Sequence, residues 1–507
     1  MNNQVAENIT FSESLSAGEI TQIIVDKYRD SPAIKEMRVA DNYFAVRNEQ
    51  IEKKTRVYYD KERKPIENPK ASNVKVKSNF LRMLVQQKQD YGFAKTFILK
   101  LKDENEKEIE LKENDYGKEW KKFLDECLFK IAYTLAGQSV NHGLAWGYVW
   151  IDEDGELQLK DVNGELIYPI WKDRQHTELD RLVYNYKSEK YDSLNPTVTE
   201  YAEYWTKDER RLFNVTNSYV EENEEGLALQ AEHSHFGENK KGVSSWERIP
   251  FICFKATDDE KTLLSFIKEQ IDAYDVLDSK SVDGLVDDLD PILVLKAISP
   301  QVGDLIEARE LAKMTRTISV DSDGDAHYIQ AQTPIDNHSK EKESLRRDII
   351  KFGYGIDYED ARFGGNPNQL VIKSLYQNLD TYTDGLERHF QDFVNNLKYF
   401  FDKWYEFTDK GSFEECQKYK LLVKLDRSMM INQSAQIEDT VKLAQTGVSR
   451  KTLLEHNPVV QDVELEEERI EEENKQKSKD DLFNFAQKTS IENGGEYQPE
   501  EEKENEE

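Results

Sequence analysis

The sequence has few cysteines, and their spacing does not predict a cross-linked or metal-bound framework. Only Cys127, Cys253 and Cys416 occur among 507 residues, far apart and without a CxxC pair. Such cysteines are typical of buried, reduced thiols in a cytoplasmic chain. The first fifteen residues contain no basic segment followed by an apolar run, and no stretch approaches the ~18 apolar residues of a membrane span. We therefore expect a protein made and used in a cytoplasm, without a membrane partner.

Positive charge is outnumbered by negative charge. The chain has 100 acidic and 69 basic residues, which gives a formal net charge of -31. Residues 461–507 hold 18 of the acidic residues against 6 basic ones, so the rest of the chain is acidic as well. A protein that coats DNA needs an excess of cations to neutralise phosphates. This chain therefore either ignores nucleic acid or handles it without gripping it.

What the sequence does contain is a mixture of helical and strand periodicity in a chain long enough for roughly two to four domains. Apolar residues recur at helical spacing in 16–48, 80–91 and 120–140, and they alternate with a period of two in much of 143–254. A β-hairpin is predicted at 97–111 and a short strand at 421–425. The polar, basic stretch 53–77 has the composition of a loop, and 221–242 that of a mobile loop. Together these patterns predict an α+β fold.

Two long helices are predicted on either side of a small αβ insert. The first spans 258–289, where Asp258 and Asp259 suit the helix dipole and Pro291 ends the pattern. The second runs from about 335 to 352 and precedes a glycine-rich break at 353–368. Within the insert we predict a strand at 292–297, a helix at 302–314 and a hairpin that pairs 317–320 with 327–331. Further helices are predicted at 369–407, 432–445, 449–456 and 463–476, before a disordered tail from 477 onward.

The order of several short motifs resembles the portal, or head-to-tail connector, proteins of tailed double-stranded DNA bacteriophages, especially those of siphophages of Gram-positive hosts. The stretch Asn79–Tyr91 is similar to the family's Asn-Phe…Val-x-x-Lys-x-x-Tyr segment. The other matching segments are Gly147–Trp150 followed by Tyr168–Trp171, Ile249–Ile252, Asp283–Leu295, Leu345–Lys373 with Gly364-Gly365, and Gly447–Leu454 followed by Asn457-Pro458. Two places depart from the family: Gly92–Lys95 replaces a Gly-x-Pro element, and Asn366–Gln369 replaces Ser-Gly-x-Ala-x-Lys. The resemblance covers most of the chain, and the order of the motifs carries it.

The resemblance implies an α+β portal fold that assembles as a dodecameric ring at one capsid vertex. The implied parts are a wing (1–257 and 370–430), two stem helices (258–289 and 336–356), a clip (290–335), a tunnel loop (357–369), a helical crown (431–476) and a disordered acidic tail (477–507). The ring would be the channel for genome packaging and ejection, with no catalytic residues, metal or cofactor. It would stand in the portal vertex of the virion, and in the host cytoplasm during assembly.

The resemblance also implies sites and partners. Double-stranded DNA would pass the tunnel-loop candidates Arg362, Phe363, Gly364, Gly365, Asn366, Asn368 and Gln369. A terminase large subunit, and later head-completion or neck adaptor proteins, would dock on the clip, where the candidates are Asp304, Glu307, Arg309 and Lys313. Scaffolding protein and major capsid protein are the further expected partners.

A basic face on the second stem helix has two interpretations. It consists of Lys340, Lys342, Arg346, Arg347 and Lys351. These cations could meet DNA in the channel, or they could pair with acidic residues of a neighbouring subunit, such as Glu269, Asp272 or Asp275. We slightly favour the second interpretation.

Other features also have competing interpretations. The cluster Asp283, Asp287, Asp288 and Asp290 could bind a metal in a nuclease, but a solvated helix end is the simpler interpretation. The aromatic stripe at 376–405 is more typical of a core or subunit interface than of a base-stacking platform. The net acidity could lower friction for DNA in the lumen, or it could simply keep a large assembly soluble. A third possible function is an acidic helical adaptor of the capsid that forms no channel.

Overall fold

The computed structural model describes residues 9–59, 62–67, 71–104, 107–191, 196–216, 219–222, 235, 245–287, 292–296, 325–329, 335–360, 369–427, 433–457, 460, 463, 466–467 and 469–476. They belong to two compact units. The larger unit consists of Met1–Asp357 and Gln377–Ser428, and the smaller one of Tyr358–Tyr376 and Met429–Glu507. Of the helices in these described ranges, none is both long enough and apolar enough to cross a lipid bilayer.

Two capped helices open the larger unit. Helix α1 (Ala17–Tyr28) follows Ser16, whose side chain accepts a hydrogen bond from the Glu19 N–H while the Glu19 carboxylate accepts one from the Ser16 N–H. This reciprocal capping box satisfies amide groups that have no partner inside the helix. Helix α2 (Pro32–Phe44) follows the N-cap Ser31, and its proline occupies the first turn, where no hydrogen bond is lost. The short helix α3 (Glu49–Glu52) comes next.

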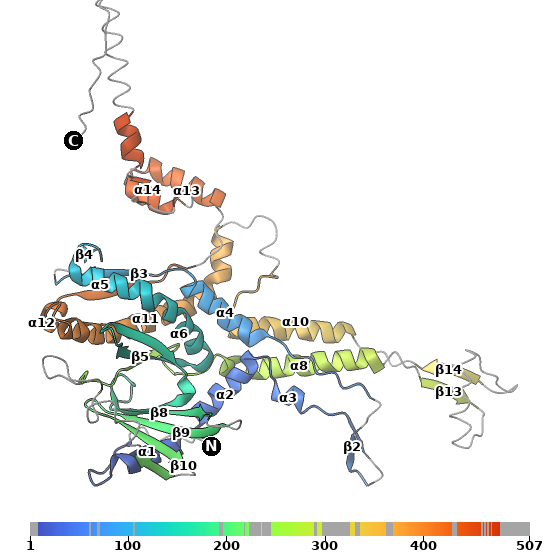
Figure 1. The fold of residues 1–507 in the computed structure, drawn as a ribbon. Helices are drawn as coiled ribbons and strands as arrows, with labels where there is room; N and C mark the ends of the chain where they lie inside the picture. The colour runs from blue at the N-terminus through green and yellow to red at the C-terminus, as the bar shows by residue number, and fades with distance from the viewer. Residues whose placement is uncertain are drawn as a thin grey trace, which may run out of the picture. The chain divides into compact units, whose positions relative to one another are not determined.

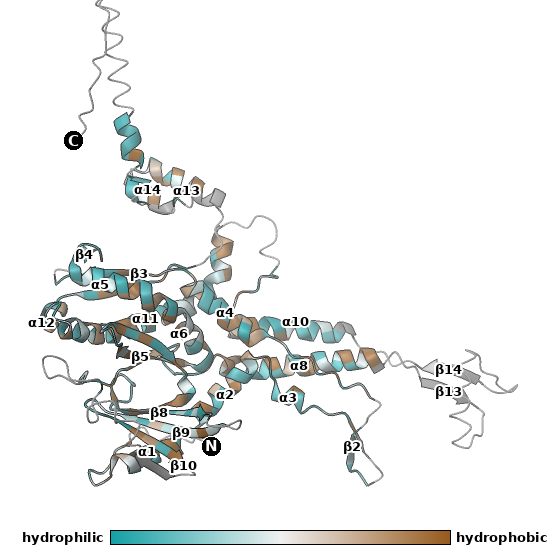
Figure 2. Ribbon diagram, in the orientation of Figure 1, coloured by the Kyte–Doolittle hydropathy of each residue, from teal (hydrophilic) through white to brown (hydrophobic). Residues whose placement is uncertain are grey.

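A layer of helices contains the main core (Figure 1). Its elements are α4 (Phe80–Phe93), α5 (Asp115–Phe123), the π-helical turn η1 (Leu124–Leu128), α6 (Phe129–His142), α11 (Gln369–Phe407) and α12 (Phe413–Cys416). Apolar segments follow α11 in Figure 2, and its Phe390 and Phe401 are 0% exposed. Trp120 stacks on Phe401 with 4.0 Å between ring centroids. The aromatic stripe therefore belongs to the core, as expected.

Apart from two-stranded pairs, such as β1 (Val57–Tyr59) with β2 (Pro65–Glu67), the described part of the larger unit contains three antiparallel sheets. The predicted hairpin is present, and strand β3 (Ile98–Lys102) pairs with β4 (Glu108–Ile109) on one side and with β15 (Lys420–Lys424) on the other. A second sheet has the order β12-β5-β6, formed by Phe251–Lys255, Leu144–Ile151 and Leu157–Val162. The third has the order β11-β10-β9-β8-β7, formed by Tyr219–Glu222, Arg210–Thr216, Thr197–Trp205, Leu179–Lys190 and Ile167–Trp171. Aromatic side chains such as Trp146, Trp205 and Phe251 fill a second core between these strands and α1.

The predicted pair of long helices is present. Helix α8 (Leu264–Asp287) and helix α10 (Ile335–Phe352) pack side by side, and α10 returns antiparallel to α8 (Figure 1). Strands β13 (Ile292–Lys296) and β14 (Asp325–Ile329), which lie between these helices in the chain, pair with each other. The predicted pairing of 317–320 with 327–331 and the helix predicted at 302–314 involve residues outside the described ranges.

The boundaries of both long helices differ from the prediction. Helix α8 begins at Leu264 rather than at 258, because Glu260 has a left-handed backbone (φ 54°) and the Thr262 side chain caps the Ser265 N–H at 3.2 Å. Asp258 and Asp259 therefore precede the helix instead of occupying its first turn. Helix α10 ends at Phe352, and residues 353–357 form a turn rather than the end of the predicted stem helix 336–356.

The described part of the smaller unit includes the short helices α13 (Gln433–Gln445) and α14 (Arg450–His456). The Ser449 side chain accepts a hydrogen bond from the Thr452 N–H at 3.3 Å, so Ser449 is the N-cap that the sequence predicts. Residues 469–476 are helical, in agreement with the prediction for 463–476, whereas the tail from 477 onward lies outside the described residues.

Candidate DNA-channel and subunit-contact sites

The five cations of α10, the predicted second stem helix, divide into two groups. Lys342 donates to Asp278 of α8 at 2.5 Å and lies over the Tyr274 ring at 5.4 Å. Arg346 forms two 2.8 Å hydrogen bonds to the Asp357 carboxylate. Burial opposes the charge of Lys342, but Asp278 outweighs it and raises the pKa of that lysine, while Glu343 and Asp357 together raise the pKa of Arg346. These two cations therefore stabilise the subunit itself.

The other three cations face solvent. Lys340 and Lys351 are exposed and have no acidic partner among the residues that the structure describes. Arg347 is 66% exposed and its nearest carboxylate, that of Glu343, lies 3.9 Å away in the same helix. The exposed length of α10 is mostly hydrophilic (Figure 2). Lys340, Arg347 and Lys351 thus remain candidates for contact with DNA or with another subunit.

Two of the acidic residues expected to meet those cations across a subunit interface are buried in their own chain. Asp272 accepts hydrogen bonds from Tyr43 and Asn48, and Asp275 accepts from the Ser78 N–H at 2.9 Å. Their side chains are 7% and 1% exposed. The expectation was therefore wrong for these two residues, and only Glu269, which is exposed, remains available.

Asp275 also begins a polar row on α8 that holds the chain segment 72–78. Further along this row, Ser279 accepts from the Val76 N–H at 3.0 Å, and Asp283 accepts from the Val74 N–H at 2.7 Å. Because alternate amides of the segment bond to side chains spaced four residues apart, the segment lies extended along one face of the helix. The prediction of a loop over 53–77 was therefore wrong in part, because the stretch contains the paired strands Val57–Tyr59 and Pro65–Glu67 and much of this docked strap.

Asp283 is the most strongly held residue of this row. Lys54 donates to its carboxylate at 2.6 Å, Arg56 approaches to 3.4 Å and the Ser72 hydroxyl donates at 3.0 Å. Burial alone would raise the pKa of Asp283, but the hydrogen bonds from Lys54, Val74 and Ser72 outweigh burial and lower it. The interpretation of Asp283 as part of a solvated helix end was therefore wrong. Its carboxylate is already neutralised by Lys54, which disfavours the metal site; Asp288 and Asp290 lie outside the described residues.

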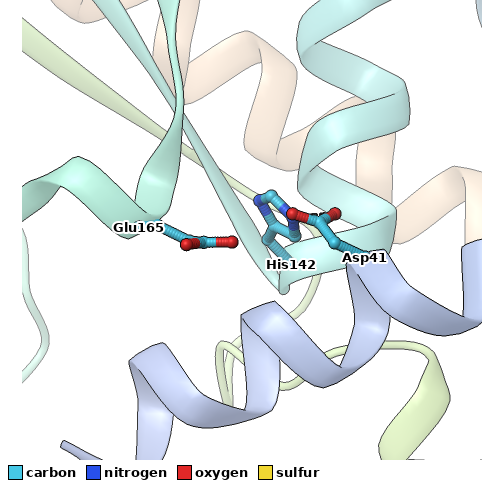
Figure 3. A group of neighbouring side chains, drawn as sticks. All are labelled: Asp41, His142 and Glu165. Carbon is cyan, nitrogen blue, oxygen red and sulfur yellow. Dashed lines mark hydrogen bonds and ion pairs between the residues drawn. The ribbon is translucent and has the colours of Figure 1, made fainter. Parts of the chain in front are cut away.

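A group of side chains that sequence reasoning missed links α2, α6 and the turn before β7 (Figure 3). Asp41 lies 2.6 Å from His142 Nε2 and accepts from Asn141 at 2.7 Å, and Glu165 pairs with Arg38 at 3.2 Å. Burial and the nearby Asp41 raise the pKa of Glu165, whereas the contact with His142 lowers that of Asp41. The ligand atoms of Asp41, His142 and Glu165 lie within 4.8 Å of one another. Because Asp41 already has two protein partners, we interpret the group as an ion-paired tether between elements.

The remaining candidates cannot be placed. Tunnel-loop residues Arg362, Phe363, Gly364, Gly365, Asn366 and Asn368 lie outside the described ranges, as do the clip residues Asp304, Glu307, Arg309 and Lys313. Gln369 is the first residue of α11. The roles given to these residues therefore stay predictions.

Comparison with known proteins defines the class of this molecule. Residues 27–480 match the family described as phage portal protein, SPP1 Gp6-like, so the chain belongs to the phage portal proteins. It is 26% identical over 463 residues to the portal protein of Bacillus phage SPP1, with 89% of this chain and 85% of that protein covered. It is also 26% identical over 483 residues to the portal protein of Clostridium phage phiCD119, with 90% of this chain and 97% of that protein covered.

A solved structure, the neck of a native GTA particle computed with C12 symmetry, contains a chain with a TM-score of 0.39 and 9% identity to this one. That match covers 74% of this chain and 88% of the other, and it is too distant to carry weight. The sequence matches confirm the predicted family and its α+β class. Portal proteins are structural components of the virion rather than enzymes, which confirms the predicted non-enzymatic role and leaves the nuclease alternative without support.

Proposed function

We propose that this portal protein assembles as a dodecameric ring at one vertex of the capsid, and that double-stranded DNA passes through the ring during packaging and ejection. The observation that carries the proposal is the family match over residues 27–480. The antiparallel pair α8 and α10 supports it, because two long helices flanking a small β unit suit a stem that leads to a clip.

We divide the subunit into the parts that the portal family implies, and we take the bounds of the two stem helices from the structure. The wing would comprise residues 1–257 and 370–430, and the stem would consist of α8 and α10. The clip would comprise residues 290–335. The tunnel loop would begin after the turn 353–357 and end at residue 369, and the crown would comprise residues 431–476. A terminase large subunit and then neck adaptor proteins would dock on the clip. Scaffolding protein and major capsid protein would contact the outer surface of the ring.

The negative net charge of the chain supports a channel that does not bind DNA tightly. With a net charge of -31, the subunit can neutralise few phosphates, and counterion release, which drives tight DNA binding, would be weak. Lys340, Arg347 and Lys351 are the exposed stem cations that could touch either DNA or a neighbouring subunit.

Native mass spectrometry of the purified protein tests the assembly. We expect a closed species with about twelve times the 59.3 kDa mass of the chain. A monomer or a ladder of open oligomers that persists across protein and salt concentrations would contradict the ring.

A further inference from the structure

Helix α4 carries a lysine that is completely buried. Lys88 is 0% exposed and has no carboxylate partner in the described part of the chain. Its ammonium donates to the backbone carbonyl of Gly353 and, at 3.3 Å, to that of Leu84, and it lies over the Tyr382 ring at 5.1 Å. Burying a charge costs free energy unless its hydrogen bonds are satisfied. A lysine at this position therefore connects α4 to the turn that follows α10, at a cost in free energy that an apolar residue would avoid.

The residue before Lys88 makes a second connection to the same segment. The Gln87 side-chain amide donates to the Ile356 carbonyl at 3.0 Å, and its oxygen accepts from the Ile356 N–H at 3.0 Å. A side-chain amide that satisfies both backbone groups of one residue fixes the position and the orientation of that residue. Two consecutive side chains of α4 thus hold residues 353 and 356.

The segment between these two points is closed by its own hydrogen bonds. The Gly355 N–H donates to Ile350 at 2.8 Å and the Tyr354 N–H to Lys351 at 3.2 Å, which is the Schellman pattern of a helix end. Tyr354 occupies the left-handed position of this motif, with φ 52°, where glycine is the usual residue. Its ring packs on Tyr382 with 5.5 Å between centroids, a contact that a glycine at this position could not make.

Close packing and an ion pair complete the joint. A Cβ atom at Gly353 would lie 2.6 Å from a methyl carbon of Leu84 and 2.8 Å from the Ile349 carbonyl oxygen, and one at Gly355 would lie 2.2 Å from the other Leu84 methyl carbon. A larger residue at either position would therefore force the buried Leu84 side chain, and at Gly353 also the backbone, to shift. At the end of the turn, Asp357 is held by the bidentate contact with Arg346.

From these contacts we propose that Gln87 and Lys88 are positioning residues, which fix the carboxyl end of stem helix α10 and the turn 353–357 to the wing. If the proposed function holds, this joint sets the point and the direction from which the tunnel loop enters the channel. The two side chains would then act on DNA passage without touching DNA.

Hydrogen exchange of assembled wild-type and variant rings tests the joint. Gln87→Leu and Lys88→Met each remove one connection, while Gln89→Leu on the same helix removes a comparable hydrogen bond to Tyr133 at 2.9 Å and serves as the matched control. We expect the peptide covering 349–357 to exchange roughly twenty-five-fold faster in Gln87→Leu, because the variant loses two hydrogen bonds and each is worth about fivefold in the opening equilibrium. In Gln89→Leu the rate should equal that of the wild type. If Lys88→Met does not assemble, Gln87→Leu, which removes no buried charge, decides the test alone.

DNA packaging by procapsids built with the same rings tests the consequence. We expect Gln87→Leu to lower the yield of packaged DNA while Gln89→Leu keeps it. Unchanged exchange at 349–357 in both joint variants, or faster exchange with a wild-type packaging yield, would overturn the positioning role. Procapsids that package DNA equally well without this protein would instead overturn the proposed function. The hydrogen-exchange result would then still test whether Gln87 and Lys88 hold the turn 353–357.

Discussion

Replacing the buried ammonium of Lys88 by an apolar side chain of similar length should change how the stability of the protein depends on pH. Burial lowers the pKa of Lys88 from 10.5 to about 7. Between these two values the unfolded chain binds more protons than the folded chain does, so the free energy of unfolding of the wild type rises with pH. Below pH 7 both states are protonated and this contribution no longer changes. The variant Lys88→Met lacks the titrating group and should lack this rise.

The magnitude follows from the pKa difference. One pKa unit corresponds to about 1.4 kcal/mol, so two pH units above 7 give at most about 3 kcal/mol. Hydrogen bonds from Lys88 to the carbonyls of Gly353 and Leu84 favour the ammonium and reduce that figure. We expect the free energy of unfolding of wild type, minus that of Lys88→Met, to rise by about 1–3 kcal/mol from pH 7 to pH 9.

Urea unfolding at pH 6, 7, 8 and 9, at one protein concentration, measures this difference. Lys118→Met is the matched control, because its side chain is 60% exposed and pairs with Asp115 at the surface. The control should follow the wild type at every pH. A wild-type-minus-Lys88→Met difference that stays constant from pH 7 to 9 would refute the assignment of Lys88 as a buried, titrating ammonium.

Three further outcomes follow from the contacts. Lys54→Met should lower the free energy of unfolding by about 3 kcal/mol at neutral pH, because it leaves the buried Asp283 carboxylate without its closest cation. Since the pKa of Asp283 is lowered in the folded chain, this loss should shrink as the pH falls through that lowered pKa. Phe390→Ala should cost about 3–5 kcal/mol in thermal unfolding, because it opens a cavity in the main core. The third variant changes the three exposed cations of α10, Lys340, Arg347 and Lys351, to glutamine. Its free energy of unfolding should stay within about 0.5 kcal/mol of the wild type. Its rings should dissociate at a lower salt concentration, as measured by light scattering.

Matched control variants at exposed residues show whether each loss of stability is specific to the assigned contact. Lys53→Met, at a residue whose side chain is 77% exposed, should not share the effect of Lys54→Met. Tyr191→Ala, at a ring that is 64% exposed, should not share that of Phe390→Ala. Rings of the triple glutamine variant that dissociate at the wild-type salt concentration would argue against a subunit contact and leave DNA as the partner of these cations. An equal loss of stability in Lys53→Met and Lys54→Met would contradict the contact assigned to Lys54, and an equal loss in Tyr191→Ala and Phe390→Ala would contradict the packing assigned to Phe390.

The family of this chain could be predicted from its sequence, because the order of several motifs along the chain is specific even though each motif alone is weak. The segment Asn79–Tyr91 illustrates this: it resembles the family on a few residues, and the structure gives Lys88 and Tyr91 specific partners in Gly353 and Asp380. Helices and strands with regular apolar periods, such as α6, α11 and β5, were also predictable, since each buries one face or both.

What the sequence could not predict depends on contacts between distant residues. The strap 72–78 has no apolar period of its own, because its amides bond to side chains of α8 about 200 residues later. Asp41, His142 and Glu165 are likewise brought together only by the fold. The start of α8 was misplaced because acidic residues at 258–259 imitate a helix N-terminus, whereas the left-handed Glu260 prevents it.

Electron microscopy of the purified protein, with class averages viewed along the symmetry axis, tests the central claim most directly. The account predicts closed twelvefold rings with a central hole wide enough for a DNA duplex. Single subunits, open arcs or closed particles without a central hole would contradict it.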